Sequence, residues 1–132
     1  QTLSLRGVVK LIGQVPRSFM PRLMRACNIY VNTSLADGMP PSVLEAIASG
    51  KPVVSFAVGG NKDIIDDGIN GFLVPPKDYK ELASKIIYLA ENHDIIKKFS
   101  VNARQKAEME FDINKRIDKI LKIYSMIMRK QC

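Results

Sequence analysis

The residues best suited to chemistry gather in one polar segment, residues 34–46, which holds two carboxylates and a pair of prolines. Asp37 and Glu45 lie eight positions apart, on either side of Pro40 and Pro41. One of these prolines is expected to begin a helix, because proline suits the first helical turn and has no amide hydrogen to lose. The N-terminal end of a helix carries partial positive charge and stabilises a phosphate. The segment therefore predicts an anion site flanked by two carboxylates.

Each carboxylate has a chemical use at that helix start and also a simpler structural one. Glu45 lies only about 7–8 Å along the helix axis from Pro40, since a helix rises about 1.5 Å per residue. Its carboxylate can therefore accept hydrogen bonds from both hydroxyls of a ribose, as in dinucleotide-binding folds. Asp37 can hold hydroxyls of an attached sugar. Gly38 can take a backbone conformation closed to other residues and admit a ligand close to the chain. Without further support, a turn role for Asp37 and a solvated Glu45 are the simpler interpretations.

Short apolar runs and helical spacing of apolar residues predict the elements that must position this segment. We expect strands at 7–13, 29–32, 53–58 and 72–74. We expect helices at 19–26, 40–50 and 62–66, and helical structure from about residue 78 onward. The alternation implies an α/β fold, a Rossmann-like parallel sheet of about four strands with helices on both faces. Ligands bind such sheets at the carboxyl ends of the strands, so the candidate loops are 13–17, 33–41 and 59–63.

The composition fits a single domain and excludes several classes of protein. The chain has 132 residues, of which 46% are hydrophobic and 25% are charged, which excludes a disordered or low-complexity chain. No apolar run approaches the roughly 20 residues of a membrane span. Despite a net charge of +7, the sequence has no helix-turn-helix, zinc finger or aromatic-studded strand, so we expect no nucleic-acid partner. Cys27, Cys132 and His93 are too scattered for a metal site; we interpret Cys27 as a reduced core residue and His93 as part of a surface turn.

Three segments together resemble one known family, the retaining glycosyltransferases of the GT-B fold in the group 1 or family 4 class. Their pattern E-G-x-P-x-x-x-L-E-A-x-A-x-G-x-P-V-V is similar to DGMPPSVLEAIASGKPVV at 37–54, where Asp37 replaces the first Glu. GGNKDII at 59–65 resembles the family's G-G-x-x-E-I-I, and DGINGFLVP at 67–75 resembles D-G-x-N-G-x-L-V-P. Upstream, the GQV sequence that starts at Gly13 looks like the family's loop after its third strand. The resemblance covers roughly residues 8–124.

The resemblance implies that residues 1–132 are a single, partial nucleotide-sugar-binding domain, the second half of a GT-B C-terminal domain. Asp37 is implied as the catalytic-site residue that contacts hydroxyls of the donor sugar, and Glu45 as the residue that holds the ribose hydroxyls. The backbone amides of Gly38, Met39 and Ser42 would cradle the diphosphate, and backbone near Val15 would meet the base. The implied donor-binding residues are Glu45, Gly38, Met39, Ser42, Val15 and Gly13.

The resemblance also implies an activity and partners. A hexose or related sugar would pass with retention from a nucleotide-sugar to a glycan or lipid-linked acceptor, with no metal and no other cofactor. The acceptor would bind an N-terminal domain, and a basic pair that contacts the diphosphate would precede residue 1, so we expect this chain alone to transfer no sugar. The last helix would leave an apolar face open to self-association, through Ile113, Ile117, Leu121 and Tyr124. We expect a cytoplasmic protein, with a peripheral position at the inner face of the membrane as an alternative.

Two other interpretations stay open. A flavodoxin-like or receiver-like α/β module would also alternate strands with helices, but it needs acids after its first strand or a phosphate-binding run of Ser, Thr and Gly, and neither is visible. A non-catalytic interaction or nucleotide-binding module of glycosyltransferase ancestry would keep the same motifs. Titration with UDP, GDP and ADP separates a sugar-nucleotide site from a module that binds none of them.

Overall fold

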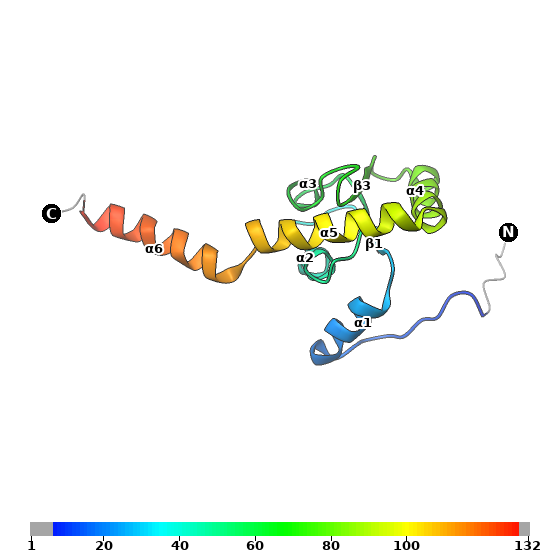
Figure 1. Ribbon diagram of the computed structural model, residues 1–132, viewed down its shortest axis with the longest axis horizontal. Coiled ribbons are helices and arrows are strands. Elements are labelled where there is room, and N and C mark those ends of the chain that lie inside the picture. Colours follow the sequence, from blue (N-terminus) through cyan, green and yellow to red (C-terminus); the bar gives the residue numbers. More distant parts are fainter. Residues whose placement is uncertain (1–6, 130–132) are drawn as a thin grey trace.

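The computed structural model describes residues 7–129, and their centre is a small parallel sheet (Figure 1). Its strands are β1 (Tyr30–Asn32), β2 (Val53–Phe56) and β3 (Gly71–Val74), in the order β1-β2-β3. Tyr30 is opposite Val53, and Val53 is opposite Gly71, so the three strands start level with one another. The α/β class and the parallel sheet are confirmed, with three strands in the described residues where we expected about four.

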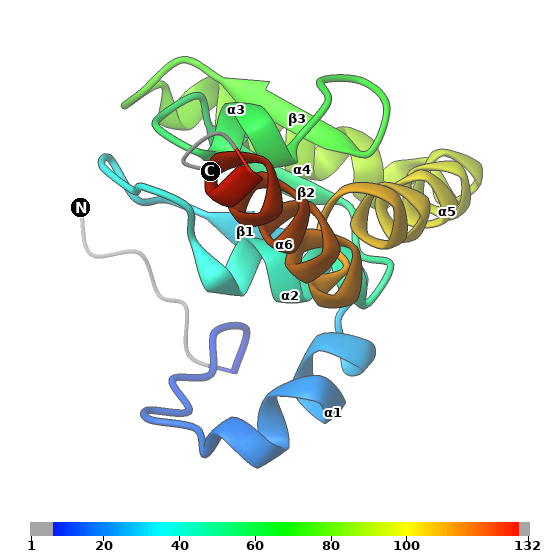
Figure 2. The same ribbon diagram turned by 90° about the vertical axis from the view of Figure 1, so that its left-hand side faces the viewer.

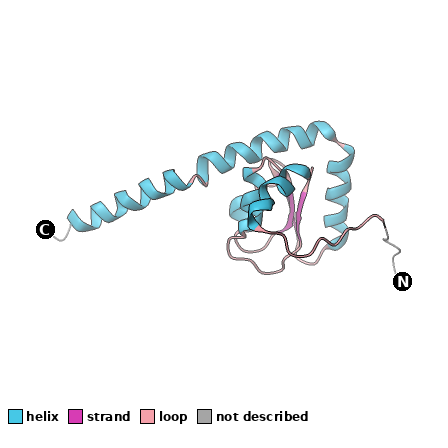
Figure 3. Cartoon of the chain, turned by 90° about the horizontal axis from the view of Figure 1, so that it is seen from below, coloured by secondary structure: helices cyan, strands magenta, loops and turns pink. Residues whose placement is uncertain are grey.

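The helices follow the predicted order, with most ends within one or two residues of the expected positions. They are η1 (Arg17–Phe19), α1 (Met20–Ala26), α2 (Pro41–Ala48), α3 (Asn61–Ile64), α4 (Tyr79–Glu91), α5 (His93–Glu110) and α6 (Ile113–Arg129). Figure 2 shows α1 on the side of α2 that faces away from the sheet. Figures 1 and 3 show α6 leaving the end of α5 and extending beyond the rest of the molecule.

The predicted strand at 7–13 is wrong. These residues have no regular structure, and their apolar side chains are exposed, with 82% of Val8 and 93% of Leu11 open to solvent. An apolar run becomes a strand only where a neighbouring strand pairs with its backbone. Within residues 7–129, β1 pairs with β2 alone, and 7–13 lies outside the sheet.

Both faces of the sheet are covered, because β2 is buried over its whole length and its side chains alternate between two clusters. Val53 packs with α2, α1 and the second half of α5. Val54 and Phe56 pack on the opposite face with α4 and Phe99 of α5. The sheet thus fixes α2 on one face, and α2 is the helix that carries the predicted site.

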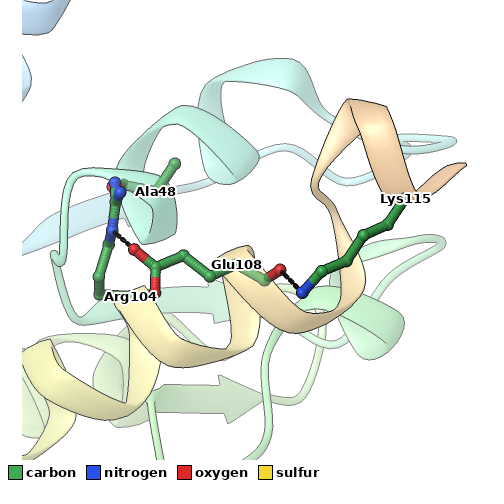
Figure 4. Close-up of polar contacts among 4 residues, drawn as sticks. All are labelled: Ala48, Arg104, Glu108 and Lys115. Carbon is green, nitrogen blue, oxygen red and sulfur yellow. Dashed lines mark hydrogen bonds and ion pairs between the residues drawn. The ribbon is translucent and has the colours of Figure 1, made fainter.

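The polar contacts in Figure 4 join the C-terminal end of α2 to α5, and the end of α5 to the start of α6. Arg104 of α5 donates from Nη1 to the carbonyl of Ala48, which is an orphan acceptor in the last turn of α2. Its Nε pairs with the Glu108 carboxylate at 2.6 Å. Lys115 of α6 donates from Nζ to the Glu108 backbone carbonyl at 2.8 Å. These contacts hold α2 against α5 and fix the direction in which α6 begins.

Cys27 is not the core residue that the sequence predicted, because it belongs to neither core cluster, whereas His93 lies at the surface as expected. Cys27 is half-buried and donates from Sγ to the Met24 carbonyl at 3.1 Å, as a small packed thiol. His93 is exposed at the junction of α4 and α5, and Cys132 lies outside the described residues. Over the part of the chain that the structure describes, no helix is long and apolar enough to cross a membrane.

Candidate functional site

The predicted site forms where β1 and β2 end and their following loops meet. Asn32 is the last residue of β1, and only 8% of it is exposed. Its Nδ2 donates to Oδ2 of Asp37 at 3.3 Å, and its Oδ1 accepts from the Ser34 amide at 3.0 Å. Asn32 therefore orients the Asp37 carboxylate. The sequence analysis missed it; the available signal was an amide side chain closing an apolar strand.

The loop that carries Asp37 rests on the glycine pair after β2. The Gly60 amide donates to the Gly38 carbonyl at 2.6 Å. A Cβ on Gly60 would lie 2.0 Å from that carbonyl oxygen, and one on Gly59 would lie 1.7 Å from the Asp37 oxygen. Gly59 also has a φ of 44°, which favours glycine. The two loops therefore cross in backbone contact that only glycine allows.

The special conformation expected at Gly38 is not present. Its φ lies outside the left-handed region, and a Cβ there would meet no atom within 4 Å. What glycine leaves at this position is open space in front of the loop. In this site the left-handed conformation occurs at Gly59 instead, whereas Gly60 has a φ of −69° and is required only by the close approach of the Gly38 carbonyl.

A buried amide anchors the glycine pair to β2. Asn61 begins α3 and is fully buried, and its Nδ2 donates to Oγ of Ser55 at 2.8 Å and to the Phe56 carbonyl at 3.2 Å. Among the buried side-chain nitrogen and oxygen atoms of the described residues, only Oδ1 of Asn61 has no hydrogen-bond partner. Because Ser55 and Phe56 end the central strand, these hydrogen bonds fix the Gly59–Gly60 loop relative to the sheet.

The start of α2 offers free backbone donors. Pro40 caps the helix and Pro41 is its first residue, and neither has an amide hydrogen. Among residues 7–129, no oxygen accepts from the amides of Gly38, Met39 or Ser42. These are the three amides predicted as diphosphate donors. They remain available to an outside acceptor at the positive end of the helix.

Glu45 lies one turn further along α2, off the buried stripe formed by Val43, Ala46 and Ile47. Its side chain is half-buried, and it lines a cavity of about 250 Å³ between α2 and the segment that runs from η1 into α1. The other lining residues are Arg17, Met20, Pro21, Met24, Ala48 and Ser49. Glu45 thus faces a space that can hold part of a ligand, which a merely solvated glutamate does not.

Two predicted donor-binding residues, Gly13 and Val15, precede the first lining residue of this cavity in the chain, and the backbone near Val15 is the part predicted to meet the base. Gly13 is exposed with a φ of 64°, and Val15 is half-buried. Neither lines the cavity, whereas Arg17, two residues after Val15, does. The sequence analysis did not select Arg17, because its position beside α2 depends on how α1 packs. No group of three or more His, Cys, Asp or Glu that could hold a metal ion occurs in the described part of the chain.

Carboxylates and free amides at the strand ends of a parallel sheet are typical of nucleotide-binding α/β domains. Comparison with known protein families shows which of these nucleotide-binding families the chain resembles. The family model described as glycosyl transferases group 1 matches residues 1–106, and the chain belongs to this family. The resemblance found in the motifs is thereby confirmed.

Curated relatives are longer than this chain. It is 30% identical over 129 residues to the UDP-Gal:alpha-D-GlcNAc-diphosphoundecaprenol alpha-1,3-galactosyltransferase of Escherichia coli, covering 97% of this chain and 33% of that protein. It is 34% identical over 123 residues to the trehalose synthase of Pyrococcus horikoshii, covering 93% of this chain and 29% of that protein. The chain spans about a third of the length of these relatives.

A solved structure supports the fold assignment. HepE of Anabaena, in complex with UDP and glucose, aligns with a TM-score of 0.84 and 31% identity, over 92% of this chain and 33% of that one. The same protein is also known in complex with UDP-glucose. The expected α/β architecture of a GT-B C-terminal domain is confirmed.

Proposed function

We propose that this chain is the donor-binding part of a retaining glycosyltransferase and that it binds a nucleotide-diphosphate sugar along α2. The observation that carries the proposal is the juxtaposition of free amides at the start of α2 with the half-buried Glu45 one turn later. A diphosphate and a ribose are separated by a similar short distance in a nucleotide. One helix therefore presents the donors that a diphosphate needs and the acceptor that a ribose needs.

The diphosphate binds at the amides of Gly38, Met39 and Ser42. Negative charge grows on this group as the bond to the sugar breaks, and pre-positioned donors at a helix start stabilise such charge. Because Pro40 and Pro41 donate no hydrogen bond, binding depends on these three amides. This arrangement supports a site that needs no metal ion, and we expect a chelator to leave sugar transfer unchanged.

Asp37 holds hydroxyls of the donor sugar. Its carboxylate is half-buried and is oriented by Asn32 from beneath the loop. A fixed carboxylate next to the diphosphate donors holds the sugar ring in one position relative to its leaving group. Positioning of this kind lowers the barrier by removing freedom before the reaction.

The relatives support the substrate classes. HepE is known in complex with UDP and with UDP-glucose, which supports a nucleotide-sugar as the donor. The E. coli relative is named for a sugar linked to diphosphoundecaprenol, which supports a lipid-linked acceptor with a glycan as the alternative. Such an acceptor fits an enzyme that works on the cytoplasmic side, at the inner face of a membrane.

The test is sugar transfer by the protein at its natural full length, with proton NMR of the product's anomeric linkage. Incubation with a panel of nucleotide-sugars and lipid-linked or glycan acceptors is expected to give a product that retains the donor's anomeric configuration. Asp37→Asn is expected to abolish transfer. The 132-residue chain alone is expected to give no product. Nucleotide binding without transfer by the full-length protein would favour the non-catalytic module instead.

A further inference from the structure

The cavity beside Glu45 is also lined by an arginine, Arg17, to which the proposed function assigns no role. Arg17 lies in η1, 28 positions before Glu45 in the chain, and the two side chains line the same space of about 250 Å³. Arg17 is exposed, and among residues 7–129 it forms no ion pair and no side-chain hydrogen bond. The guanidinium is therefore free to donate to a ligand in the cavity.

The cavity extends from Glu45 toward the C-terminal end of α2. Ala48 and Ser49 line it, and they follow Glu45 by about one turn of helix, roughly 5 Å. The free amides lie in the opposite direction, at the start of the helix. A nucleotide with its diphosphate at those amides and its ribose at Glu45 therefore directs its base into the cavity. The volume fits part of a ligand, since pockets for whole drug-sized ligands measure about 300–1,000 Å³.

We propose that Arg17 selects the base of the donor nucleotide, favouring a base with a carbonyl on its outer edge over one with an amino group. This inference rests on the proposed function. A guanidinium only donates hydrogen bonds, so it pairs with the O4 carbonyl of uracil or with O6 and N7 of guanine. Cytosine and adenine carry amino donors at the matching positions, and these donors repel a guanidinium.

The rest of the cavity suits a flat ring. Met20, Pro21 and Met24 supply apolar surface from α1, and methionine adapts its shape to the face of a ring. Such surface packs against the face of the ring and does not distinguish a carbonyl edge from an amino edge. Arg17 is the cation among the lining residues, and Glu45 is engaged by the ribose. The hydroxyl of Ser49 both donates and accepts, so it pairs with either edge. Discrimination between carbonyl and amino edges therefore depends on Arg17.

The test compares nucleotides that differ at one edge. Isothermal titration of the full-length protein with UDP and CDP, and with GDP and ADP, measures the preference for carbonyl over amino in each ring type. We expect a preference of about tenfold or more in at least one pair, the scale of a good arginine contact to a base. Arg17→Ala is expected to reduce that preference to less than about threefold. Arg22→Ala, an exposed arginine of α1 that does not line the cavity, is expected to keep it.

Each other outcome overturns a defined statement. If Arg17→Ala weakens all four nucleotides and inorganic diphosphate by the same factor, Arg17 contacts the diphosphate and the inference is wrong. If the preference survives in Arg17→Ala while Glu45→Ala weakens every nucleotide, base selection lies elsewhere and the proposed function stands. If the wild-type protein binds no nucleotide, both fail. Thermal melting of each variant separates these outcomes from loss of fold.

Discussion

At the scale of single residues, the site depends on side chains that orient other side chains. Asp37 belongs to a loop, and its carboxylate would sample many directions without the Nδ2 of Asn32 at 3.3 Å. Asn32 itself is held at the end of β1, where it pairs with the central strand. The sheet thus fixes the Asn32 side chain, and the Asn32 side chain in turn orients the Asp37 carboxylate.

Asn32→Ala is expected to reduce kcat more than it changes KM for the nucleotide-sugar. The substitution removes the hydrogen bond to the Asp37 carboxylate and the one from the Ser34 amide, but it leaves α2 with Glu45 in place. Loss of one hydrogen bond of this kind is worth about 0.5–1.5 kcal/mol, so a roughly two- to tenfold fall in kcat is expected. Steady-state kinetics of the full-length protein measure it. Asn28→Ala, an exposed amide two residues before β1, serves as control, and an equal loss there would contradict the orienting role.

Residue spacing in the sequence was enough to select the two carboxylates, because their separation fits a helix start. It did not select Asn32 or Arg17. The roles of these two residues depend on neighbours that the sheet and α1 bring close in space. Spacing along the sequence does not give those distances. The sequence analysis also expected that only glycine fits at position 38. In the structure, only glycine fits at positions 59 and 60, because two loops cross there in backbone contact.

At the scale of elements, the contact between Gly38 and Gly60 predicts different effects on stability when either glycine is replaced by alanine. Gly60→Ala puts a methyl group 2.0 Å from the Gly38 oxygen, so the loop must move. We expect a loss of about 1–3 kcal/mol in the free energy of unfolding and weaker nucleotide binding. Gly38→Ala meets no protein atom, so its stability is expected to stay within about 0.5 kcal/mol of wild type.

Nucleotide affinity then reports what occupies the space in front of Gly38. If the diphosphate lies there, Gly38→Ala binds the nucleotide-sugar roughly tenfold more weakly, about 1.4 kcal/mol, although its fold is unchanged. Urea unfolding and isothermal titration on both variants measure the two quantities. A Gly38→Ala protein with wild-type affinity would show that the ligand lies elsewhere.

The turn before α4 contains a residue with a strained backbone, and a substitution that removes the strain is expected to change the free energy of unfolding. Lys77 has a φ of 68°, a conformation that costs a side-chain-bearing residue about 1–2 kcal/mol. Lys77→Gly removes that cost but adds about 0.5–1 kcal/mol of unfolded-state entropy. We therefore expect a net gain of about 0.5–1 kcal/mol in the free energy of unfolding by urea. Lys80→Gly in the first turn of α4 is the control and is expected to lose less than about 1 kcal/mol, the cost of glycine in a helix interior. A loss at both positions would refute the strain.

Most elements followed from the sequence because their apolar pattern and their caps agree. α2 begins at a proline and ends before Gly50, whose φ is 67°, as proline and glycine preferences predict. Residues 7–13 carry an equally apolar pattern and still form no strand. Strand formation needs a partner edge, and the pattern of one segment says nothing about its neighbour.

At the scale of the whole molecule, α6 is a long helix that packs against no other element in the described part of the chain. None of its residues is buried, and the apolar side chains along one face are between 46% and 66% exposed at Ile113, Ile117, Leu121 and Tyr124. Its opposite face is basic, with Lys115, Lys119 and Lys122. An apolar face of this length on a projecting helix (Figure 1) favours association.

We expect the 132-residue chain to form dimers or larger assemblies through this face. Leu121→Glu is expected to shift the molar mass measured by light scattering toward a single copy, because it places a charge in the apolar contact. Lys122→Glu changes the charge on the opposite face and is expected to leave the assembly unchanged. A species of 14.8 kDa for the unaltered chain at high concentration would contradict the prediction.

The central claim is that Glu45 binds the ribose of a nucleotide donor, and one titration tests it most directly. Isothermal titration of the full-length protein with UDP, GDP and ADP identifies the nucleotide that binds, and the same titration is repeated with Glu45→Ala. We expect affinity to fall by about 1–3 kcal/mol, the scale of a lost charged hydrogen-bond partner, with little change in melting temperature because Glu45 lies off the buried stripe. Glu91→Ala, an exposed glutamate at the end of α4, is expected to bind like wild type. Unchanged nucleotide affinity in Glu45→Ala would contradict the claim.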